Sequence, residues 1–511
     1  MDKVLDILSK SKWLVVAALF AFCVAPTFIS YQPYQFRWDD SNYLLGSIKV
    51  SQAFWSGNVH GLGAMVGKRP PAMALLGLPW GPLASWDAAS KCFITLAAVI
   101  SLLAALCLYL LLRIGGTPVF LVAASVCVVA SIGPYPPGAS AHWDATAFMA
   151  DNLFAWTTLA AVLLIPYEAR THCPSIKGAV MRGILWGSIL SLGAMTKVNF
   201  FYFIVLIVPT LFFIRLHYGG LRGAVAALIA FACWSAPSAI YLARWGRPVF
   251  DNAKAFSFGR LADFYYIPLL QFLGDTIRES PGLVLSFVLT VTALIYIVIQ
   301  RRRILWGPDF LTLLIMIGFG IVVLASHNRQ IRFAFPAIVA LPFLTGILMS
   351  GKGHSASGRS AALAAGLVLC GLLVASVPTR HRANRQQSLG RADAVLAQAA
   401  GCNAKRIMLA TDSPTLNRNL MHLAIAVSAL GAAVEVDTLA YQAMSGAPIE
   451  EDFRAIRESD EVVFQDKDAL SPPFANQRVL EYERYTRQQG GFDPIRVGGD
   501  VSVYPMYCRK K

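Results

Sequence analysis

The chain has 511 residues, of which 56% are hydrophobic and only 14% charged, and its mean hydropathy is +0.55. A soluble protein of this length needs far more polar surface, so the composition excludes a soluble protein and indicates an integral membrane protein. The net charge of +15 lies almost entirely in residues 1–379, which indicates a role in topology and lipid contact and argues against nucleic-acid binding, because no basic and aromatic face accompanies it.

Membrane-spanning helices are expected along most of the first 379 residues. A helix that crosses a bilayer needs roughly 20 apolar residues, and the chain offers about eleven such stretches. They lie near residues 13–31, 92–113, 117–132, 147–166, 179–195, 198–214, 222–243, 281–300, 309–326, 333–350 and 360–378. The first has a basic start, but its apolar core is long and further spans follow, so we interpret it as a helix and not as a signal peptide. The sequence therefore predicts a polytopic α-helical membrane protein.

The loops between these spans separate by charge when the N-terminus is placed in the cytoplasm. The inner loops are then basic, as the positive-inside rule expects, and the outer segments are rich in aspartate. The inner loops hold Arg113, Arg170, Lys177, Arg182, Arg215, Arg222, Arg301, Arg302, Arg303, Lys352 and Arg359, with Glu168 and Asp309 as their main acids. We therefore expect a multi-pass protein of the inner (plasma) membrane with an extracytoplasmic C-terminal segment.

Two outer loops are long. Residues 32–91 contain Leu44, Ile48 and Phe54-Trp55 in helical rhythm, which predicts a helix lying at the membrane interface until Pro70-Pro71 ends the pattern. Residues 244–280 are aromatic and mixed in charge. Such a composition suits a loop that folds over a substrate at the level of the lipid headgroups.

The last 132 residues, 380–511, predict a small extracytoplasmic α/β domain that follows the membrane domain of residues 1–379. Residues 380–402 form a polar helical link, and a helix is expected over 415–430. Short strands are expected at 406–410, 434–436, 461–464 and 501–504. Cys402 and Cys508 are the only cysteines of this segment. They could pair if it faces an oxidising compartment, and the sequence leaves this open.

Several ionisable residues fall at the outer ends of the expected spans although they are far apart in sequence. They are Asp39, Asp40, His142, Asp144, Asp151, Lys197, His327, Arg329 and Arg332. Ionisable groups near hydrocarbon are costly, which makes them candidates for function. Asp39-Asp40 follows the first span directly, and Lys197 lies in a minimal turn between two spans.

The two charge types suit complementary tasks. A carboxylate can accept a proton from a hydroxyl nucleophile or hold a divalent metal ion. Lysine and arginine can neutralise a phosphate leaving group. A helix start at Asp39-Asp40 would keep these carboxylates ionised. Acids and bases at membrane depth therefore favour an amphiphilic substrate with an anionic phosphate head, such as a polyprenyl-phosphate sugar.

This constellation resembles the GT-C superfamily of membrane glycosyltransferases, in particular the protein O-mannosyltransferase, lipid A aminoarabinose transferase and rhizobial core-sugar transferase group. Those families carry an acidic pair in the first outer loop, commonly Asp-Glu, shortly before a Tyr. Here the run is Asp39-Asp40-Ser41-Asn42-Tyr43, with Asp in place of Glu. Asp151 matches a second acid near the fourth span, and Lys197-Val198-Asn199 matches a Lys in a short outer turn. An Arg-aromatic-Pro run matches Arg332-Phe333-Ala334-Phe335-Pro336, and the resemblance covers roughly residues 10–350.

The resemblance implies a GT-C-like architecture and a glycosyltransferase that takes sugar from a polyprenyl-phosphate donor. Asp39 would be the catalytic base, with Asp40 and Asp151 beside it in the catalytic set, and Lys197, Arg329 and Arg332 would contact the donor phosphate. Tyr43, His142, Asp144 and His327 are candidates for substrate contact. Metal dependence stays open, because Asp39, Asp40 and Asp151 could bind Mg²⁺ or Mn²⁺ or act without metal. The acceptor hydroxyl could belong to an envelope lipid, a glycan or a protein.

Two other functions are compatible with the same residues. The first is a transporter or flippase of a lipid-linked saccharide, although carriers usually show paired halves and midplane charges, and this chain shows no half-repeat. The second is a non-catalytic envelope assembly subunit whose C-terminal domain binds a partner. Ordinary structural roles are also available: Asp39, Asp40 and Asp151 could cap helices, and Lys197 could anchor its turn at the interface.

Overall fold

The structure is a computed structural model. The residues that it describes form two compact units, which we treat separately: the first takes those within 60–76 and 93–381, and the second those within 30–59, 77–92 and 382–511. The boundary expected near residue 380 lies outside the described residues. These are 38–58, 69–85, 87–115, 150–171, 175–258, 266–279, 307–326, 386–410, 412–413, 416–427, 434–464, 477–488, 491–495 and 506–509, with positions 288, 291, 295, 336 and 340.

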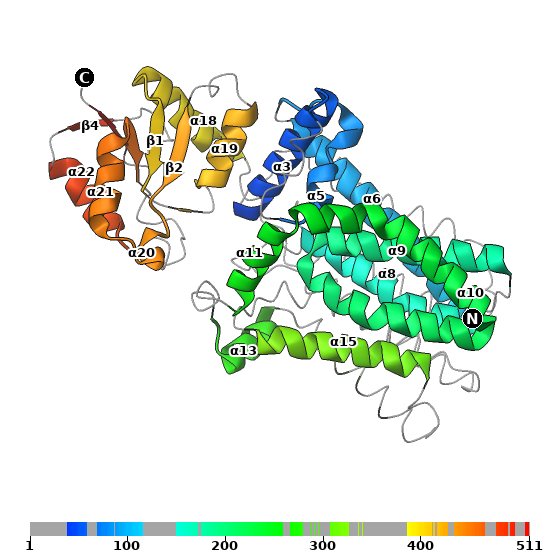
Figure 1. Cartoon of the computed structure of the whole chain (residues 1–511). Coiled ribbons are helices and arrows are strands. Elements are labelled where there is room, and N and C mark those ends of the chain that lie inside the picture. Colours follow the sequence, from blue (N-terminus) through cyan, green and yellow to red (C-terminus); the bar gives the residue numbers. More distant parts are fainter. Residues whose placement is uncertain are drawn as a thin grey trace, which may run out of the picture. The chain divides into compact units, whose positions relative to one another are not determined.

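The first unit is a helical bundle (Figure 1). Helix α8 (Ala150–Arg170) packs against α9 (Ile176–Thr196), α10 (Phe201–Trp245) and α15 (Pro308–Ala325). Helix α6 (Asp87–Gly115) enters this unit at Phe93. The unit also holds the short helix α5 (Ala72–Leu75), the 3₁₀ turn η4 (Val198–Phe200), α11 (Arg247–Phe258) and α13 (Leu269–Glu279).

Apolar composition explains why these helices form a membrane domain. Within the described residues, four stretches are long and apolar enough to cross a membrane: Lys91–Leu111, Ile176–Thr196, Val198–Trp245 and Pro308–Ala325. They coincide with spans expected near 92–113, 179–195, 198–214 with 222–243, and 309–326, and α8 coincides with 147–166. The spans expected at 13–31, 117–132 and 360–378, and almost all of 281–300 and 333–350, lie outside the described residues. The count of eleven therefore stays a prediction.

A glycine divides α10 into the two spans that the sequence predicts. Gly220 has φ 68° and ψ 173°, a conformation that glycine adopts far more readily than other residues. A Cβ atom at Gly183 of α9 would collide with the carbonyl oxygen of Ala227 in the second half of α10. The backbones of the two helices therefore approach closely, as small residues allow in membrane bundles.

Charged residues of the bundle gather at two opposite ends. Asp151 lies in the first turn of α8, whereas Glu168 and Arg170 lie in its last turn, about 25 Å away along the helix. At this second end Glu168 accepts hydrogen bonds from Arg182 (3.0 Å) and Trp186 (3.1 Å). The end also contains Arg215, with its Nη1 atom 3.9 Å from Glu168, and the ion pair of Arg170 with Asp309. This grouping matches the sidedness expected from the sequence; which end faces the cytoplasm stays a prediction.

The second unit contains a five-stranded sheet in the order β2-β1-β3-β5-β4. Strand β1 (Arg406–Leu409) is parallel to β2 (Glu435–Thr438) and β3 (Glu461–Val463), and β5 (Met506–Arg509) is antiparallel to β3 and β4 (Phe492–Ile495). The strands expected at 406–410, 434–436 and 461–464 coincide with β1, β2 and β3. Residues 501–504, expected as a strand, lie outside the described residues.

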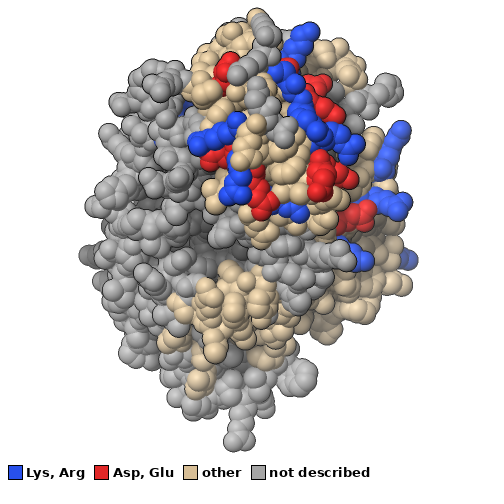
Figure 2. All heavy atoms as spheres, turned by 90° about the vertical axis from the view of Figure 1, so that its left-hand side faces the viewer, with Lys and Arg blue, Asp and Glu red and all other residues tan. Residues whose placement is uncertain are grey.

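Five helices accompany the sheet: α18 (Gln386–Gly401), α19 (Arg418–Val427), α20 (Gln442–Ser445), α21 (Ile449–Glu458) and α22 (Val479–Gln488). On one face Met408 and Val462 form a core with Ile456 of α21 and Tyr482 of α22. The exposed charges of these two helices are of mixed sign, and Figure 2 shows Lys and Arg beside Asp and Glu on this side of the molecule. Such a surface suits exposure to water.

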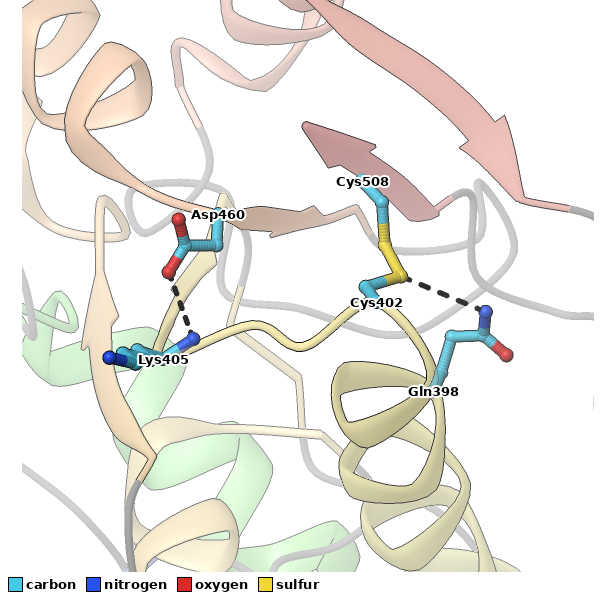
Figure 3. The surroundings of a disulfide bond; sticks show 5 residues. All are labelled: Gln398, Cys402, Lys405, Asp460 and Cys508. Carbon is cyan, nitrogen blue, oxygen red and sulfur yellow. Dashed lines mark hydrogen bonds between the residues drawn. A yellow bond between two sulfur atoms is a disulfide. The ribbon is translucent and has the colours of Figure 1, made fainter. Parts of the chain in front are cut away.

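A disulfide joins Cys402, just after α18, to Cys508 on β5 (Figure 3). The pairing that the sequence leaves open is therefore present in the structure. Near this bond, the backbone N–H groups of Lys405 and Arg406 donate to the Asp460 carboxylate at 2.9 and 3.0 Å. The bond spans 106 residues, so it restricts the unfolded chain strongly.

The helix expected after the first span belongs to this second unit. Helix α3 (Trp38–Trp55) packs against α19, and Leu44 and Ile48 are buried. Its other side bonds to the segment around the 3₁₀ turn η2 (Leu78–Trp80): Gln52 donates to the carbonyl of Leu83 (2.6 Å) and the Trp55 indole to that of Leu78 (3.0 Å). The helix is as predicted; its place at a membrane interface stays a prediction.

Candidate functional site

The Lys197 ammonium forms an ion pair with Asp151 at one end of the bundle. Helix α9 ends at Thr196, and Lys197 is extended, with φ −149° and ψ 141°. Its N–H donates to the carbonyl of Gly193 (3.1 Å) before η4 and α10 begin. The minimal turn expected from the sequence is therefore present, and its extended backbone aims the lysine side chain at the first turn of α8.

The ion pair is largely shielded from water. The Asp151 side chain is 3% exposed and that of Lys197 17%. The Lys197 Nζ atom also lies 5.5 Å from the ring centroid of Phe154, which follows Asp151 by three residues on α8. Residues three apart share a helix face, so α8 presents to the ammonium a carboxylate and an aromatic ring together.

An aromatic cluster packs around Phe154, next to the ion pair. The Phe154 ring contacts Phe200, Phe203 and Phe319 at centroid distances of 6.2, 6.4 and 6.0 Å. These rings come from α8, η4, α10 and α15, so they fix the turn that carries Lys197 to three other helices. Low-polarity surroundings strengthen the attraction between the two charges and increase the cost of separating them.

The arrangement fixes an ammonium group in place. Lys197 donates a hydrogen bond to the Asp151 carboxylate. Phosphate oxygens form strong charge-assisted hydrogen bonds with ammonium groups. A lysine that a carboxylate holds in position is therefore suited to bind an anion.

The acidic pair belongs to α3 in the second unit. Asp39 and Asp40 are the second and third residues of this helix, where the N-terminal end of the helix dipole favours anions. Their side chains lie outside what the structure describes. Tyr43, one turn later, is buried at 7% exposure.

The other predicted site residues cannot be compared with the structure. His142, Asp144, His327, Arg329 and Arg332 lie outside the described residues. Across the part of the chain that is described, no group of three or more His, Cys, Asp or Glu side chains could hold a metal ion. Because the side chains of Asp39 and Asp40 are not among those described, the metal site of three aspartates is untested.

Sequence reasoning missed the aromatic and glycine residues that build the site. Phe154, Phe200 and Phe203 are ordinary span residues in the sequence, and only the i, i+3 spacing from Asp151 points to Phe154. Gly193 was also missed, although a Cβ atom there would collide with the Phe200 ring. Its position four residues before Lys197 is the single signal the sequence offers.

Comparison with known proteins identifies the fold. No protein-family model matches the chain, and no curated protein matches it. Among solved structures, ArnT from Cupriavidus metallidurans in the apo state has a TM-score of 0.58 at 12% identity, covering 98% of both chains. The same protein bound to undecaprenyl phosphate has a TM-score of 0.52 at 12% identity, covering 97% of this chain and 98% of that one.

A second solved protein gives the same result. The oligosaccharyltransferase AglB from Archaeoglobus fulgidus, in complex with an inhibitory peptide and a dolichol-phosphate, has a TM-score of 0.52 at 10% identity. The match covers 98% of this chain and 74% of AglB. The chain therefore has the fold of ArnT and AglB, and at the level of the fold this agrees with the resemblance inferred from its motifs.

Proposed function

We propose that this protein transfers a sugar from a polyprenyl-phosphate donor to an acceptor hydroxyl at the outer face of the membrane. The observation that carries the proposal is the shielded Lys197–Asp151 ion pair at one end of a GT-C bundle. The structures of similar fold include ArnT with undecaprenyl phosphate and AglB with dolichol-phosphate. A lipid phosphate is an anionic ligand that a positioned ammonium group would bind.

Lys197 would hold the donor phosphate, and Asp151 would hold Lys197. The carboxylate fixes the position of the ammonium by accepting a hydrogen bond from it, and the held cation would attract the phosphate oxygens. As the bond to the sugar breaks, negative charge accumulates on the phosphate. A positioned cation stabilises that charge more in the transition state than in the bound donor, which accelerates transfer. Arg329 and Arg332 would share this task.

Asp39 would act as the base toward the acceptor. It takes the proton of the acceptor hydroxyl while the oxygen attacks the anomeric carbon. The new carbon–oxygen bond forms as the bond to phosphate breaks, and polyprenyl phosphate leaves with the electron pair. Attack from the side opposite the leaving group inverts the anomeric configuration. Asp40 would support the base, and Tyr43, His142, Asp144 and His327 would contact sugar or acceptor.

The decisive experiment uses purified protein in liposomes with a polyprenyl-phosphate sugar and a candidate acceptor. Asp39→Asn should lower transfer by at least about a hundredfold, as expected for loss of a catalytic base, while donor binding persists. Near-normal turnover of this variant would reject the scheme, and net donor movement without any glycosidic product would establish a carrier instead.

Identification of the donor requires a cellular measurement. Mass spectrometry of lipid-linked sugars and envelope glycans, with and without the protein, should show a polyprenyl-linked sugar that accumulates in its absence. The glycan, lipid or protein that loses the same sugar is the acceptor. Identical profiles in the two strains would contradict the proposal.

A further inference from the structure

The helix that carries the acidic pair is docked on the C-terminal α/β fold. Helix α3 packs along α19, and the two lie side by side in Figure 1. Both helices belong to the second unit, together with residues 77–92. Asp39 and Asp40 lie in the first turn of this same helix, so a shift of α3 on α19 would move the acidic pair as well.

Helix α3 is also fixed to residues 77–83 by hydrogen bonds and a close backbone contact. The Ser51 hydroxyl donates to the carbonyl of Gly81, and Gln52 donates to that of Leu83. A Cβ atom at Gly77 would lie 2.9 Å from the Ser47 carbonyl oxygen, so only glycine fits there without displacement. Isolated helices of this length are marginal in water, so α3 depends on these two contacts for its position.

His422 lies on α19, the helix that packs against α3, and it is influenced by two cationic residues, Arg418 on α19 and Lys49 on α3. The Nε atom of Arg418 donates to Nε2 of His422 at 3.2 Å, which requires that nitrogen to be unprotonated. Burial lowers the pKa of His422, and the charges of Arg418 on its own helix and Lys49 on α3 lower it further. Asp437 of β2 opposes them and is itself shared, because it pairs with both Arg418 and Arg406 at 3.3 Å.

We propose that α19 positions α3 for the reaction and that His422 controls this docking, because a positive charge on its ring would repel Lys49 across the contact. The inference rests on the proposed function, since α3 matters to the reaction only if its acidic pair does. When His422 binds a proton, its ring becomes a third positive charge beside Arg418 and Lys49. The protonated ring nitrogen can no longer accept the hydrogen bond from Arg418. His422 is thus a positioning residue, and the C-terminal unit is part of the catalytic apparatus and not a separate binding module.

The direction of the pH effect follows from the sign of the pKa shift. A histidine whose folded-state pKa lies below 6.5 stays neutral at neutral pH, and the unfolded chain binds its proton first as pH falls. Its contribution to docking is therefore present above pH 6.5 and is lost as pH falls through the lower, folded-state pKa. Transfer by the unmodified protein should decline on the acid side for this reason.

The test places a permanent charge at position 422 in the full chain. His422→Lys should raise amide exchange across residues 38–55 and lower kcat about tenfold, with donor KM changed less than about twofold, because misplacement of a catalytic group costs rate more than binding. The double variant His422→Lys with Lys49→Glu places opposite charges at the two positions. It should recover most of the kcat and most of the protection of residues 38–55 from amide exchange. Gln488→Lys, which adds the same charge at an exposed position on α22, should change neither.

A second variant separates docking from folding. Glutamine cannot be protonated, so His422→Gln should keep the activity seen at neutral pH. At acidic pH its transfer activity should decline less than that of the unmodified protein, and amide exchange of α3 should rise less. Unchanged exchange in 38–55 for His422→Lys, or unchanged kcat despite raised exchange, would overturn the inference. If the unmodified protein shows no transfer at all, the proposed function fails instead, and the exchange data still decide whether His422 controls docking.

Discussion

At the residue scale, the Lys197–Asp151 pair combines a structural cost with a proposed function. A buried charge that loses its partner is strongly destabilising, whereas a matched apolar replacement of both partners can be neutral. The pair therefore makes two separable predictions, one for stability and one for transfer.

Replacing Lys197 alone should destabilise the bundle. Lys197→Met leaves the Asp151 carboxylate 3% exposed and without its cation, at a cost of about 3 kcal/mol. Adding Asp151→Asn should recover much of that loss but not the transfer activity, because the cation proposed to bind the phosphate is still missing. Thermal unfolding in detergent and turnover in liposomes measure the two effects; a double variant that is no more stable than Lys197→Met would contradict the assignment.

Because of Glu461, we expect the stability of the sheet to have an unusual pH dependence. It is fully buried at the start of β3, neither of its oxygens has a hydrogen-bond partner among the described residues, and burial raises its pKa from 4.5 to about 8. The unfolded chain releases this proton first. The contribution of Glu461 to the stability of the fold is therefore fully present below pH 4.5 and is lost as pH rises through about 8.

The isosteric variant Glu461→Gln should remove this dependence. We expect the opening free energy of β3, from amide exchange corrected for intrinsic rates, to fall on the order of 4 kcal/mol between pH 5 and 8.5 in the unmodified protein. It should stay nearly constant in Glu461→Gln. Glu435→Gln, at an exposed position on the edge strand β2, serves as the control. Equal pH dependence in all three proteins would refute the assignment.

At the element scale, the turn between α9 and α10 depends on Gly193. A Cβ atom there would collide with the Phe200 ring, and Phe200 is part of the cluster beneath Lys197. Gly193→Ala should therefore displace η4, cost about 1–3 kcal/mol and reduce donor binding. Gly320→Ala on α15 is the matched control, because nothing lies within 4 Å of the added methyl group. It should be neutral or slightly stabilising, and equal behaviour of both variants would exclude a role for the turn.

The elements also show where local sequence patterns suffice. Apolar length places α6, α9 and α15, and Gly220 divides α10 where two spans are expected. The α/β alternation places β1, β2 and β3. The packing of α3 on α19 was not predicted, because it joins residues 38–55 to residues 418–427 through apolar side chains that any buried face would offer. Only the three-dimensional contact shows that the acidic pair belongs with the C-terminal unit.

At the scale of the whole molecule, charge sidedness was the most informative sequence signal. Long-range electrostatic rules act on every loop, so they place Asp151 with Lys197 and Glu168 with Arg182, Arg215 and Asp309 without any knowledge of packing. The same rule cannot say which residues touch. Phe154 and Glu461 escaped notice because their roles depend on neighbours that the sequence does not encode locally.

The last prediction concerns the orientation of the protein in the membrane. Positions 177 and 199 are exposed near opposite ends of α9, about 30 Å apart. In intact cells, a membrane-impermeant maleimide should label Asn199→Cys and should label Lys177→Cys only after permeabilisation, with the unmodified chain as the control for native cysteines. This result would put Lys197 at the outer leaflet, where a polyprenyl-phosphate donor could reach it. The reverse pattern would put the ion pair on the cytoplasmic side, and the proposed outer-face reaction would then be wrong.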